Sequence, residues 1–411
     1  MIIAHRIRLL PTEDQETKLW QSAGTKRFVW NWALGKQIEH MKEIGRLSKI
    51  GDKALRRELT QLKQSEEHSW LYCVSNNVGK QAVKDVCAAI DRFHEESQKD
   101  GYIYRESAKK RVAKGGRPLD FTDFKHFPKF KVRKKSLDSF YNDTSKLKVY
   151  SHCVHLEKIG KVKLAESNEI PIDAKYLNPR ITYDGKYWYI SVGTEQKIEK
   201  TELTGESIGI DLGIKELAVI SSIDKPVKNI NKTKEVRRLK KKLRRLEQQT
   251  SRKYEINKTE AKNNKERACK FNKTKNIEKF EQKKKLVHRR IANIRLNHIH
   301  QATAEIVKTK PSRIVIEDLN VKGMMKNKHL AKAIQEQCFH KFSWILEYKC
   351  QRHGIELVKA DRWFPSSKTC SKGGHYHKHL KLKDRTFICP ECGFKLDRDK
   401  NASINLANYV A

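Results

Sequence analysis

Residues 208–221 read Ile-Gly-Ile-Asp-Leu-Gly-Ile-Lys-Glu-Leu-Ala-Val-Ile-Ser, and this stretch decides the fold. Its apolar residues predict a buried strand, a tight turn and a second strand. Another apolar run, Ile314-Val-Ile-Glu317-Asp-Leu, follows a predicted helix and predicts a further buried strand. Buried strands separated by helices are typical of α/β folds. We therefore expect an α/β region in the second half of the chain.

Three carboxylates stand where a charge is costly. Asp211 and Glu317 each end an apolar strand, and Asp399 opens the last predicted helix in Asp397-Arg-Asp-Lys-Asn-Ala. A carboxylate taken out of water needs a positive partner. An Arg can be that partner, and a structural ion pair would explain any one of the three. Three such acids in a strongly basic chain favour a divalent metal ion instead.

Carboxylates of this kind serve phosphodiester hydrolysis. In a two-metal site one hard cation activates water and a second, ~3.5–4 Å away, stabilises the leaving oxygen. An RNase H-like fold provides the arrangement, with acids that converge from adjacent strands and a following helix. The Ile-Asp-Leu-Gly motif also begins actin-type and chaperone-type ATPases, which continue with Thr and Ser for phosphate contact. Here Ile214-Lys-Glu-Leu follows instead, so the sequence favours a nuclease.

The charge of the chain indicates a polyanionic partner. Lys and Arg number 88 against 49 Asp and Glu, which gives a formal net charge of +39. Such an excess repels itself unless a polyanion neutralises it, and nucleic acid is the usual one. No apolar run approaches the ~20 residues of a membrane helix, and residues 1–8 carry charges where a signal peptide would be apolar. We expect no membrane partner and a cytosolic location.

The first half of the chain combines helices with short strands. Thr12 and Gln15 fit a capping box that opens a helix carrying Leu19 and Trp20. A basic, Gly-containing loop at 108–118 marks a boundary. Further helices are predicted around 28–41 and 78–93, and strands at 3–10, 130–132, 154–156, 162–164 and in a hairpin over 181–192 that turns at Asp184-Gly185. The strands predict a small β-barrel or sheet.

A basic helical hairpin is predicted inside the second half. One apolar seam joins its two helices, and Lys and Arg cover the other faces. The seam residues are Val236, Leu239, Leu243 and Leu246 on the first helix and Val287, Ile291 and Ile294 on the second. Ordinary solvated charge is one explanation of the basic faces. Among so many uncompensated cations, contact with a guide strand or a duplex is favoured.

The combination resembles the TnpB family, the RNA-guided nucleases of insertion-sequence transposons, which are related to type V CRISPR effectors. The matching stretches extend over nearly the whole chain. They are residues 208–215, 315–324, 361–371 and 397–402, the Arg27-Phe-Val-Trp-Asn-Trp segment, the Asp184-Gly hairpin and residues 288–295.

This resemblance implies an RNA-guided DNA endonuclease with a RuvC-like nuclease domain in a prokaryotic cytosol or nucleoid. Asp211, Glu317 and Asp399 fall on the family's three catalytic acids and would hold Mg²⁺ in a two-metal site; Asp399 is preferred to Asp397 on its Asp-x-Asn-Ala match. The implied partners are a guide RNA derived from the transposon end and target double-stranded DNA, cut beside a short flanking motif. The neighbours Glu216 and Asp318 are interpreted as supporting or solvated groups, and Arg398 as either a contact to the scissile phosphate or a structural cation.

A domain plan follows from the same resemblance. A β-rich, wedge-like domain is expected at 1–20 and 120–200, and a helical recognition lobe at 21–119. The RuvC-like domain is expected at 201–360 and 394–411, with the basic helical insertion at about 232–308. A zinc-knuckle-like insert is expected at 361–393.

The knuckle departs from the family's two Cys-x-x-Cys pairs. Its second half has the pair, but its first half has Gly373 where a second Cys is expected. Structural zinc needs four ligands, so a histidine would have to complete the site. Surface histidines in a loop rich in His and Lys are the alternative. The candidate Zn²⁺ ligands are Cys370, Cys389, Cys392 and His375, with His377 as the other choice of histidine.

The incomplete knuckle keeps a second function open. A guide-RNA-dependent DNA-binding regulator would use the same fold and RNA with weak or no cleavage. A structural RNA-binding or ribosome-associated protein would explain the charge but not three embedded carboxylates.

Overall fold

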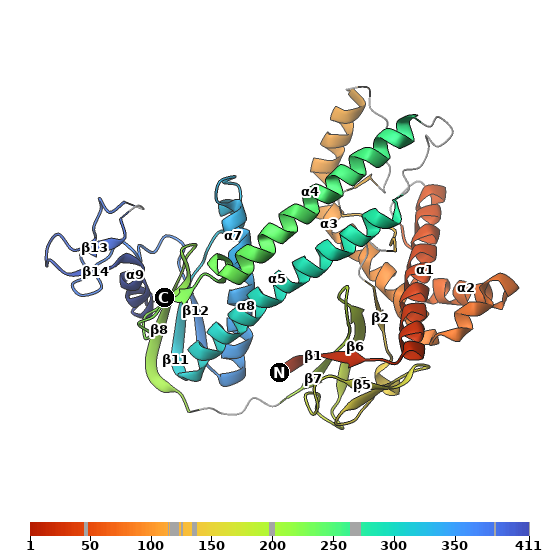
Figure 1. The fold of residues 1–411 in the computed structure, drawn as a ribbon, viewed down its shortest axis with the longest axis horizontal. Helices are drawn as coiled ribbons and strands as arrows, with labels where there is room; N and C mark the ends of the chain where they lie inside the picture. Colours follow the sequence, from red (N-terminus) through yellow and green to blue (C-terminus); the bar gives the residue numbers. More distant parts are fainter. Residues whose placement is uncertain are drawn as a thin grey trace. The chain divides into compact units, whose positions relative to one another are not determined.

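The computed structural model describes residues 1–44, 48–113, 115, 123–124, 126–133, 138–196, 202–263, 273–381 and 384–410. The chain forms two compact units, Ile2–Gln196 and Lys197–Ala411, the second joined by Met1 (Figure 1). Among the described residues no helix is both long enough and apolar enough to cross a membrane.

The first unit contains an antiparallel sheet in the order β2-β6-β7-β1-β5-β4-β3. The edge strands are β2 and β3. Among the described residues these two strands do not pair with each other, so the sheet is open and does not close into a barrel. The hairpin predicted at Asp184-Gly185 joins β6 to β7, and Gly185 has the positive φ of +97° that its turn requires. The strands are β1 (Ile2–Leu10), β2 (Ser139–Tyr141), β3 (Lys148–Val149), β4 (Cys153–Leu156), β5 (Gly160–Leu164), β6 (Tyr176–Tyr183) and β7 (Trp188–Glu195).

Helices complete this unit. The predicted capping box is present, because the Thr12 hydroxyl accepts from Gln15 N and the Gln15 carbonyl oxygen Oε1 accepts from Thr12 N. The prediction of separate helices near 12–20 and 28–41 was wrong: one continuous helix includes both, because its buried stripe continues from Leu19 through Ala23 to Val29 without a break. The elements are α1 (Glu13–Ile44), α2 (Asp52–Gln64), η1 (Glu66–Cys73), α3 (Asn76–Ala113) and η3 (Thr144–Lys146).

The predicted strand at 130–132 was also wrong. This segment is extended but joins no sheet among the described residues. Side chains of α1 satisfy its backbone instead: Trp30 Nε1 donates to Lys129 O at 3.1 Å, and Asn31 exchanges two hydrogen bonds with the Lys131 backbone at 2.7 and 2.9 Å. The apolar side chains of this segment, Phe130 and Val132, are exposed, so the alternation of apolar and polar residues does not mark a buried face here.

The second unit contains a mixed sheet in the order β10-β9-β8-β11-β12. β8 pairs antiparallel with β9 and β9 with β10, whereas β11 runs parallel to both β8 and β12. The strands are β8 (Thr204–Leu212), β9 (Glu216–Ile220), β10 (Val227–Lys228), β11 (Pro311–Glu317) and β12 (Glu356–Ala360), and a separate hairpin consists of β13 (Thr386–Ile388) and β14 (Lys395–Asp397).

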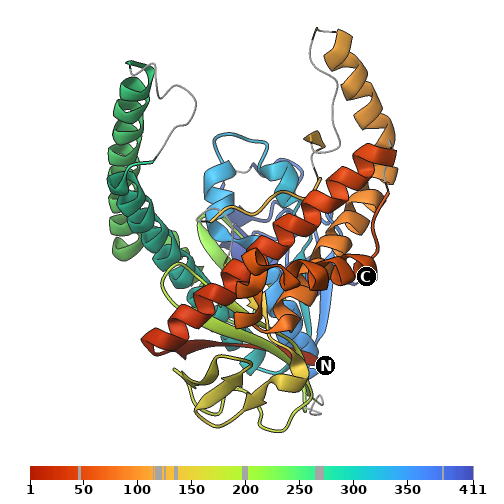
Figure 2. The same cartoon turned by 90° about the vertical axis from the view of Figure 1, so that its right-hand side faces the viewer.

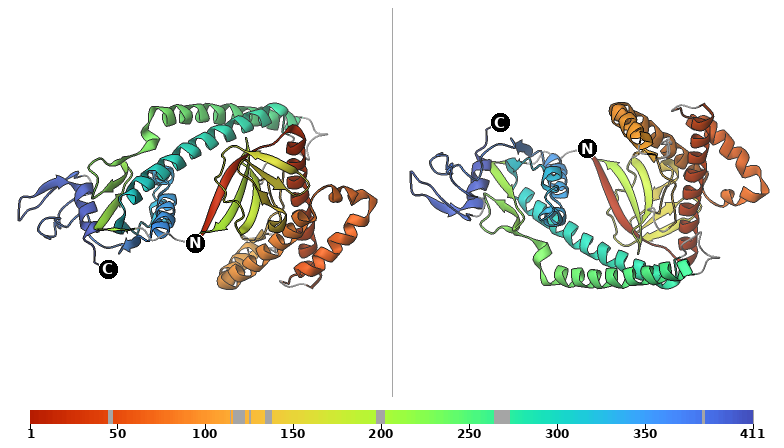
Figure 3. Two further views of the ribbon diagram at one scale, coloured as in Figure 1. Left: turned by 90° about the horizontal axis from the view of Figure 1, so that it is seen from below. Right: turned by 90° about the horizontal axis from the view of Figure 1, so that it is seen from above.

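Helices cover both faces of this sheet. Ile208, Ile210 and Ile316 pack in one cluster with residues of α5 and α8, whereas Val315 packs against Leu406 of α9 on the opposite face. Figure 3 shows α9 between the sheet and the β13–β14 hairpin. The helices are η4 (Ile230–Lys232), α4 (Lys234–Asn263), α5 (Lys275–Lys308), α6 (Val321–Met324), α7 (Ala331–Gln337), α8 (Phe339–His353) and α9 (Arg398–Ala407).

The predicted helical hairpin is α4 and α5, which run side by side (Figure 2). All seven predicted seam residues belong to one cluster between the two helices. Polar contacts fix the base of the hairpin: Lys240 Nζ lies 2.6 Å from Glu336 Oε2 of α7, and Arg295 Nε donates to Asn231 Oδ1 at 2.7 Å. The hairpin is therefore attached to the sheet of its own unit at a defined place.

Candidate functional site

The strands place two of the predicted acids side by side. Ile210 of β8 lies opposite Ile316 of β11, and one residue further along the two parallel strands come Asp211 and Glu317. Both acids point away from the α5 and α8 face, because side chains alternate along a strand and the isoleucines occupy that face. Asp211 and Glu317 therefore share the face that α9 covers.

Gly209 allows α9 to lie directly on β8. A Cβ atom added at Gly209 would lie 1.9 Å from the carbonyl oxygen of Ser403 and 2.4 Å from the backbone nitrogen of Ala407. No side chain fits there, so the helix backbone touches the strand backbone. This close approach brings the first turn of α9, with Asp399, to the two strand acids.

The start of α9 separates the roles of its two aspartates. Asp397 is the N-cap, and its carboxylate accepts from the backbone N–H groups of Asp399 and Lys400 at 3.0 and 3.1 Å. Asp399 is instead paired with Arg398, whose Nη2 donates to its Oδ1 at 3.0 Å. Asp397 therefore caps the helix. Asp399 belongs with the acids Asp211 and Glu317, and Arg398 is its counter-charge.

The electrostatics show that the acids affect one another. Burial, followed by the charges of Glu317 and Asp399, raises the pKa of Asp211 well above its ordinary value. Burial also raises the pKa of Glu317, opposed by a hydrogen bond from Ser366 and reinforced by Asp399. Like charges in a partly dehydrated place disfavour ionisation. Cations supplied to this site would remove that cost, so the donor set fits hard divalent metal ions.

A polar network that was not predicted from the sequence holds the acids in place. Ser366 Oγ donates to Glu317 Oε1 at 2.7 Å. On the buried side of α9, Asn405 Nδ2 donates to the carbonyls of Ser366 and Thr369, and Asn401 Nδ2 donates to Thr369 O. Residues 366–371 are thus bound both to an acid of β11 and to the helix that carries Asp399.

The neighbouring acids that the sequence placed in supporting roles differ in their surroundings. Asp318 is exposed and forms an ion pair with Arg362 at 2.6 Å. Glu216 is partly exposed at the start of β9. Two cavities of about 140 and 350 Å³ share Glu317, Asp318 and Arg362 in their walls, so Glu317 is reachable from solvent.

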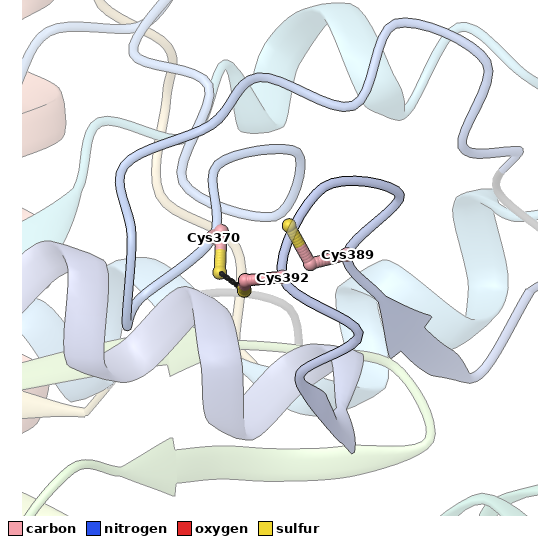
Figure 4. Close-up of side chains that lie close together, drawn as sticks. All are labelled: Cys370, Cys389 and Cys392. Atoms are coloured by element: carbon pink, nitrogen blue, oxygen red, sulfur yellow. Dashed lines mark hydrogen bonds between the residues drawn. The ribbon is translucent and has the colours of Figure 1, made fainter.

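Three of the four predicted zinc ligands come together. The Sγ atoms of Cys370, Cys389 and Cys392 lie within 4.8 Å of one another, and those of Cys370 and Cys392 are 3.8 Å apart (Figure 4). The predicted fourth ligand, His375, is not in this group, because its Nδ1 lies 2.8 Å from Glu391 Oε1. His377 packs its ring against Phe387.

The two halves of the knuckle are the same turn. In each, the first Cys N–H donates to the carbonyl five residues on, His375 or Phe394. In each, the carbonyl of that Cys accepts from a Gly four residues on, Gly374 or Gly393, with φ of +72° and +67°. Gly373 therefore occupies the place that corresponds to Cys392, and a Cβ atom there would lie 3.9 Å from the Cys392 sulfur.

Family models match three separate segments of the chain. The family model described as "Probable transposase" (OrfB_IS605) matches residues 189–328. An associated "Helix-turn-helix domain" matches 1–46, and the "Cas12f1-like, TNB domain" matches 339–406. A protein of Streptomyces pristinaespiralis named "Putative RNA-guided DNA endonuclease" is 29% identical over 98% of this chain and 88% of its own. InsQ of Escherichia coli K12, named in the same way, is 26% identical over 98% of this chain and 91% of its own.

The chain is a member of the TnpB family. The candidate site residues are divided between two of the matches, since Asp211 and Glu317 lie in the transposase segment, and Asp399 with the three thiols lies in the TNB segment. The segment named for a helix-turn-helix contains the strand β1 and the single helix α1 in this TnpB chain.

Solved structures of RNA-guided effectors also align with this TnpB chain. One is a Cas12f1–sgRNA–target DNA complex, with a TM-score of 0.34 and 14% identity over 99% of both chains. Another is the mini-RNA-guided endonuclease CRISPR-Cas_phi3, with a TM-score of 0.46 and 10% identity over 99% of this chain and 92% of that one.

Proposed function

We propose that this TnpB protein is an RNA-guided DNA endonuclease that hydrolyses phosphodiesters with divalent metal ions held by Asp211, Glu317 and Asp399. The observation that carries the proposal is the convergence of three acids, from two parallel strands and one helix, on one face of the sheet. The strand order supports an RNase H-like, RuvC-type domain, because three antiparallel strands are followed by two parallel ones.

Each residue of the site has a separate role in the proposed reaction. Mg²⁺ ions held by the three carboxylates would activate water and stabilise the leaving oxygen. Ser366 fixes the orientation of the Glu317 carboxylate through its 2.7 Å hydrogen bond. Asn401 and Asn405 keep α9 in register with the 366–371 segment. Arg398 balances Asp399 before the cations bind and can turn to a phosphate afterwards.

Guide RNA and target DNA are the proposed partners. The relatives named as RNA-guided DNA endonucleases align over nearly the whole chain, and the charge of +39 suits two nucleic acids. On α4 a groove of about 680 Å³ has Arg238, Lys241, Lys242 and Arg245 in its wall. We assign this groove to contact with phosphates. We also propose the following domains: a wedge domain at 1–20 and 120–200, a recognition lobe at 21–119, a nuclease domain at 201–360 and 394–411, and a zinc-knuckle-like insert at 361–393.

A cleavage assay tests the proposal. The protein is purified with its transposon-end RNA and given a plasmid with a guide-matched target, a randomised flank and Mg²⁺. We expect cleavage of a flank-selected subset. Asp211→Asn should abolish it, whereas Asp318→Asn, a matched control on an exposed and ion-paired carboxylate, should not. Equal cleavage by wild type and Asp211→Asn would overturn the assignment of the site.

The incomplete knuckle favours the alternative of a guided DNA-binding regulator. In that case the purified complex contains RNA and binds the matched target, but cuts nothing under the same conditions. Target binding without guide dependence would contradict both functions.

We further propose that Cys370, Cys389 and Cys392 bind zinc. Three converging thiols on two equivalent turns suit a tetrahedral Zn²⁺ site that lacks one ligand. His375 can complete it by leaving Glu391.

Gly373→Cys tests the zinc site. Because the two turns match and Gly373 needs no positive φ, a thiol there should complete the site, raise the zinc content towards one per chain and raise the melting temperature. Gly373→Ala is the control, since it adds the Cβ atom without the sulfur. No change in zinc content or melting temperature for the Cys variant would count against zinc.

A further inference from the structure

Trp363 is exposed to an extent that is unusual for its type. Its exposed fraction is 84%, compared with 55% for Trp344 and 42% for Trp70. Trp is largely buried in most proteins, because its large apolar ring gains the most from leaving water. An indole held in water therefore needs a reason in function or in disorder of the chain.

The turn that carries Trp363 is well ordered. The backbone N–H of Trp363 donates to Asp361 Oδ1 at 2.8 Å, and that of Phe364 donates to Asp361 O at 3.0 Å. Phe364 packs edge-on against the Tyr409 ring with centroids 4.9 Å apart, and the Tyr409 hydroxyl accepts from Asp361 N. The indole is thus presented to solvent from a fixed backbone. Chain disorder does not explain its exposure.

The position of Trp363 is at the edge of the carboxylate site. Its two sequence neighbours, Arg362 and Phe364, line the cavity of about 140 Å³ that Glu317 also lines. Three residues further on, Ser366 donates to Glu317. Trp363 therefore lies between two residues of this cavity wall.

A flat aromatic surface suits this place for an electrostatic reason. The site is rich in acids, so phosphates are held weakly there until cations bind. Stacking of a base on an aromatic ring does not depend on charge and accepts any base, because every base has a π-face. Arg362, beside the indole, is already paired with Asp318 at 2.6 Å, so the indole is the group of this turn that is offered to a strand.

We infer that Trp363 is a stacking platform for a base of the single DNA strand that enters the carboxylate site. This rests on the proposed nuclease function and deepens it, since it identifies the substrate of the site as an unpaired strand. It makes Trp363 a residue that binds substrate near the reacting phosphate without taking part in proton transfer.

The test measures binding of a strand, separately from cleavage. Asp211→Asn protein loaded with guide RNA is titrated with a fluorescent single-stranded oligonucleotide and with an abasic strand of equal length. Trp363→Ala should weaken binding of the base-containing strand between about fivefold and a hundredfold and leave the abasic strand unaffected. Trp363→Phe should restore most of the affinity. Trp344→Ala, at the other strongly exposed Trp of this unit, is the matched control and should have no such effect.

Salt dependence separates stacking from charge. The slope of log Kd against log salt should be the same for wild type and Trp363→Ala, because no phosphate contact is lost. Equal affinities for the base-containing strand, an equal loss with the abasic strand or a changed slope would each overturn the inference. Failure of every protein to bind either strand would overturn the nuclease proposal along with it.

Discussion

Lys131 places an amine where the folded protein disfavours a positive charge. Its Nζ lies 3.6 Å from the centre of the Trp30 ring. Burial lowers the pKa of Lys131 to about 7, and the hydrogen bond and positive charge of Lys26 are the next largest cause. The negative charge of Asp85 opposes this lowering, and the positive charge of Arg180 adds to it. The unfolded chain binds more protons than the folded one between pH ~7 and the ordinary lysine value, so the free energy of unfolding rises with pH in that window.

Replacement of Lys131 tests this consequence. Lys131→Met keeps the length of the side chain and removes the charge, so it should raise the stability of the first unit most at pH 6. The gain should shrink as the pH rises from about 7 towards the ordinary lysine value, because the folded wild-type protein then no longer buries a charged amine. Urea denaturation followed by Trp fluorescence at pH 6, 8 and 9.5 measures it, with the exposed Lys129→Met as the control. A gain that is independent of pH would contradict the account.

Single residues also show how far the site could be predicted. Asp211 and Glu317 were recognisable because each interrupts an apolar strand, which is a local pattern. Ser366 and Asn405 were not, because their value depends on a carboxylate and two carbonyls brought to them by other segments. The equivalence of Gly373 with Cys392, in contrast, was predicted from the Cys-x-x-Cys spacing, and the backbone hydrogen bonds of the two turns agree with it.

At the scale of elements, the packing of α9 on β8 depends on one glycine. Gly209→Ala would place a methyl group on two backbone atoms of α9, at 1.9 and 2.4 Å, and backbone atoms cannot turn aside as a side chain can. We expect a loss of about 3 kcal/mol or more in the free energy of unfolding, the upper range for overpacking. Loss of strand cleavage should accompany it, because Asp399 moves with the helix.

A control lies on the same strand. Gly205→Ala meets no atom within 4 Å, so its stability should change by less than about 0.5 kcal/mol. Thermal or denaturant unfolding of both variants checks the pair. Equal stabilities would mean that α9 does not rest on β8 as described.

Helices and strands whose apolar residues repeat at a regular spacing could be predicted from the sequence, and those without such a repeat could not. The seam of α4 and α5 was visible because seven apolar residues repeat at helical spacing within a polar background. The prediction of two helices within α1 was wrong because Gly24 interrupts the apolar pattern between them, although a helix tolerates an isolated glycine. The strand predicted at 130–132 was wrong because Trp30 and Asn31 bind the backbone of this segment, while its apolar side chains Phe130 and Val132 stay exposed.

At the scale of the whole molecule, the net charge of +39 opposes folding when no polyanion is bound. Salt should therefore act in opposite directions on the free and the RNA-bound protein. Between 0.1 and 1 M NaCl the screening length falls from about 10 to about 3 Å. The melting temperature of the RNA-free protein should rise over this range, because repulsion among its lysines and arginines is screened.

The RNA-bound protein should show the reverse. Its extra stability comes from binding, and the affinity for RNA falls steeply as salt increases because fewer counterions are released. Its melting temperature should fall until the two curves meet near 1 M. Differential scanning fluorimetry at matched salt concentrations measures the melting temperatures of the RNA-free and the RNA-bound protein. Poly-glutamate serves as the comparison, because it is a polyanion without bases. If the RNA-free protein were also destabilised by salt, ion pairs would outweigh the excess charge, and nucleic acid would not be needed to relieve it.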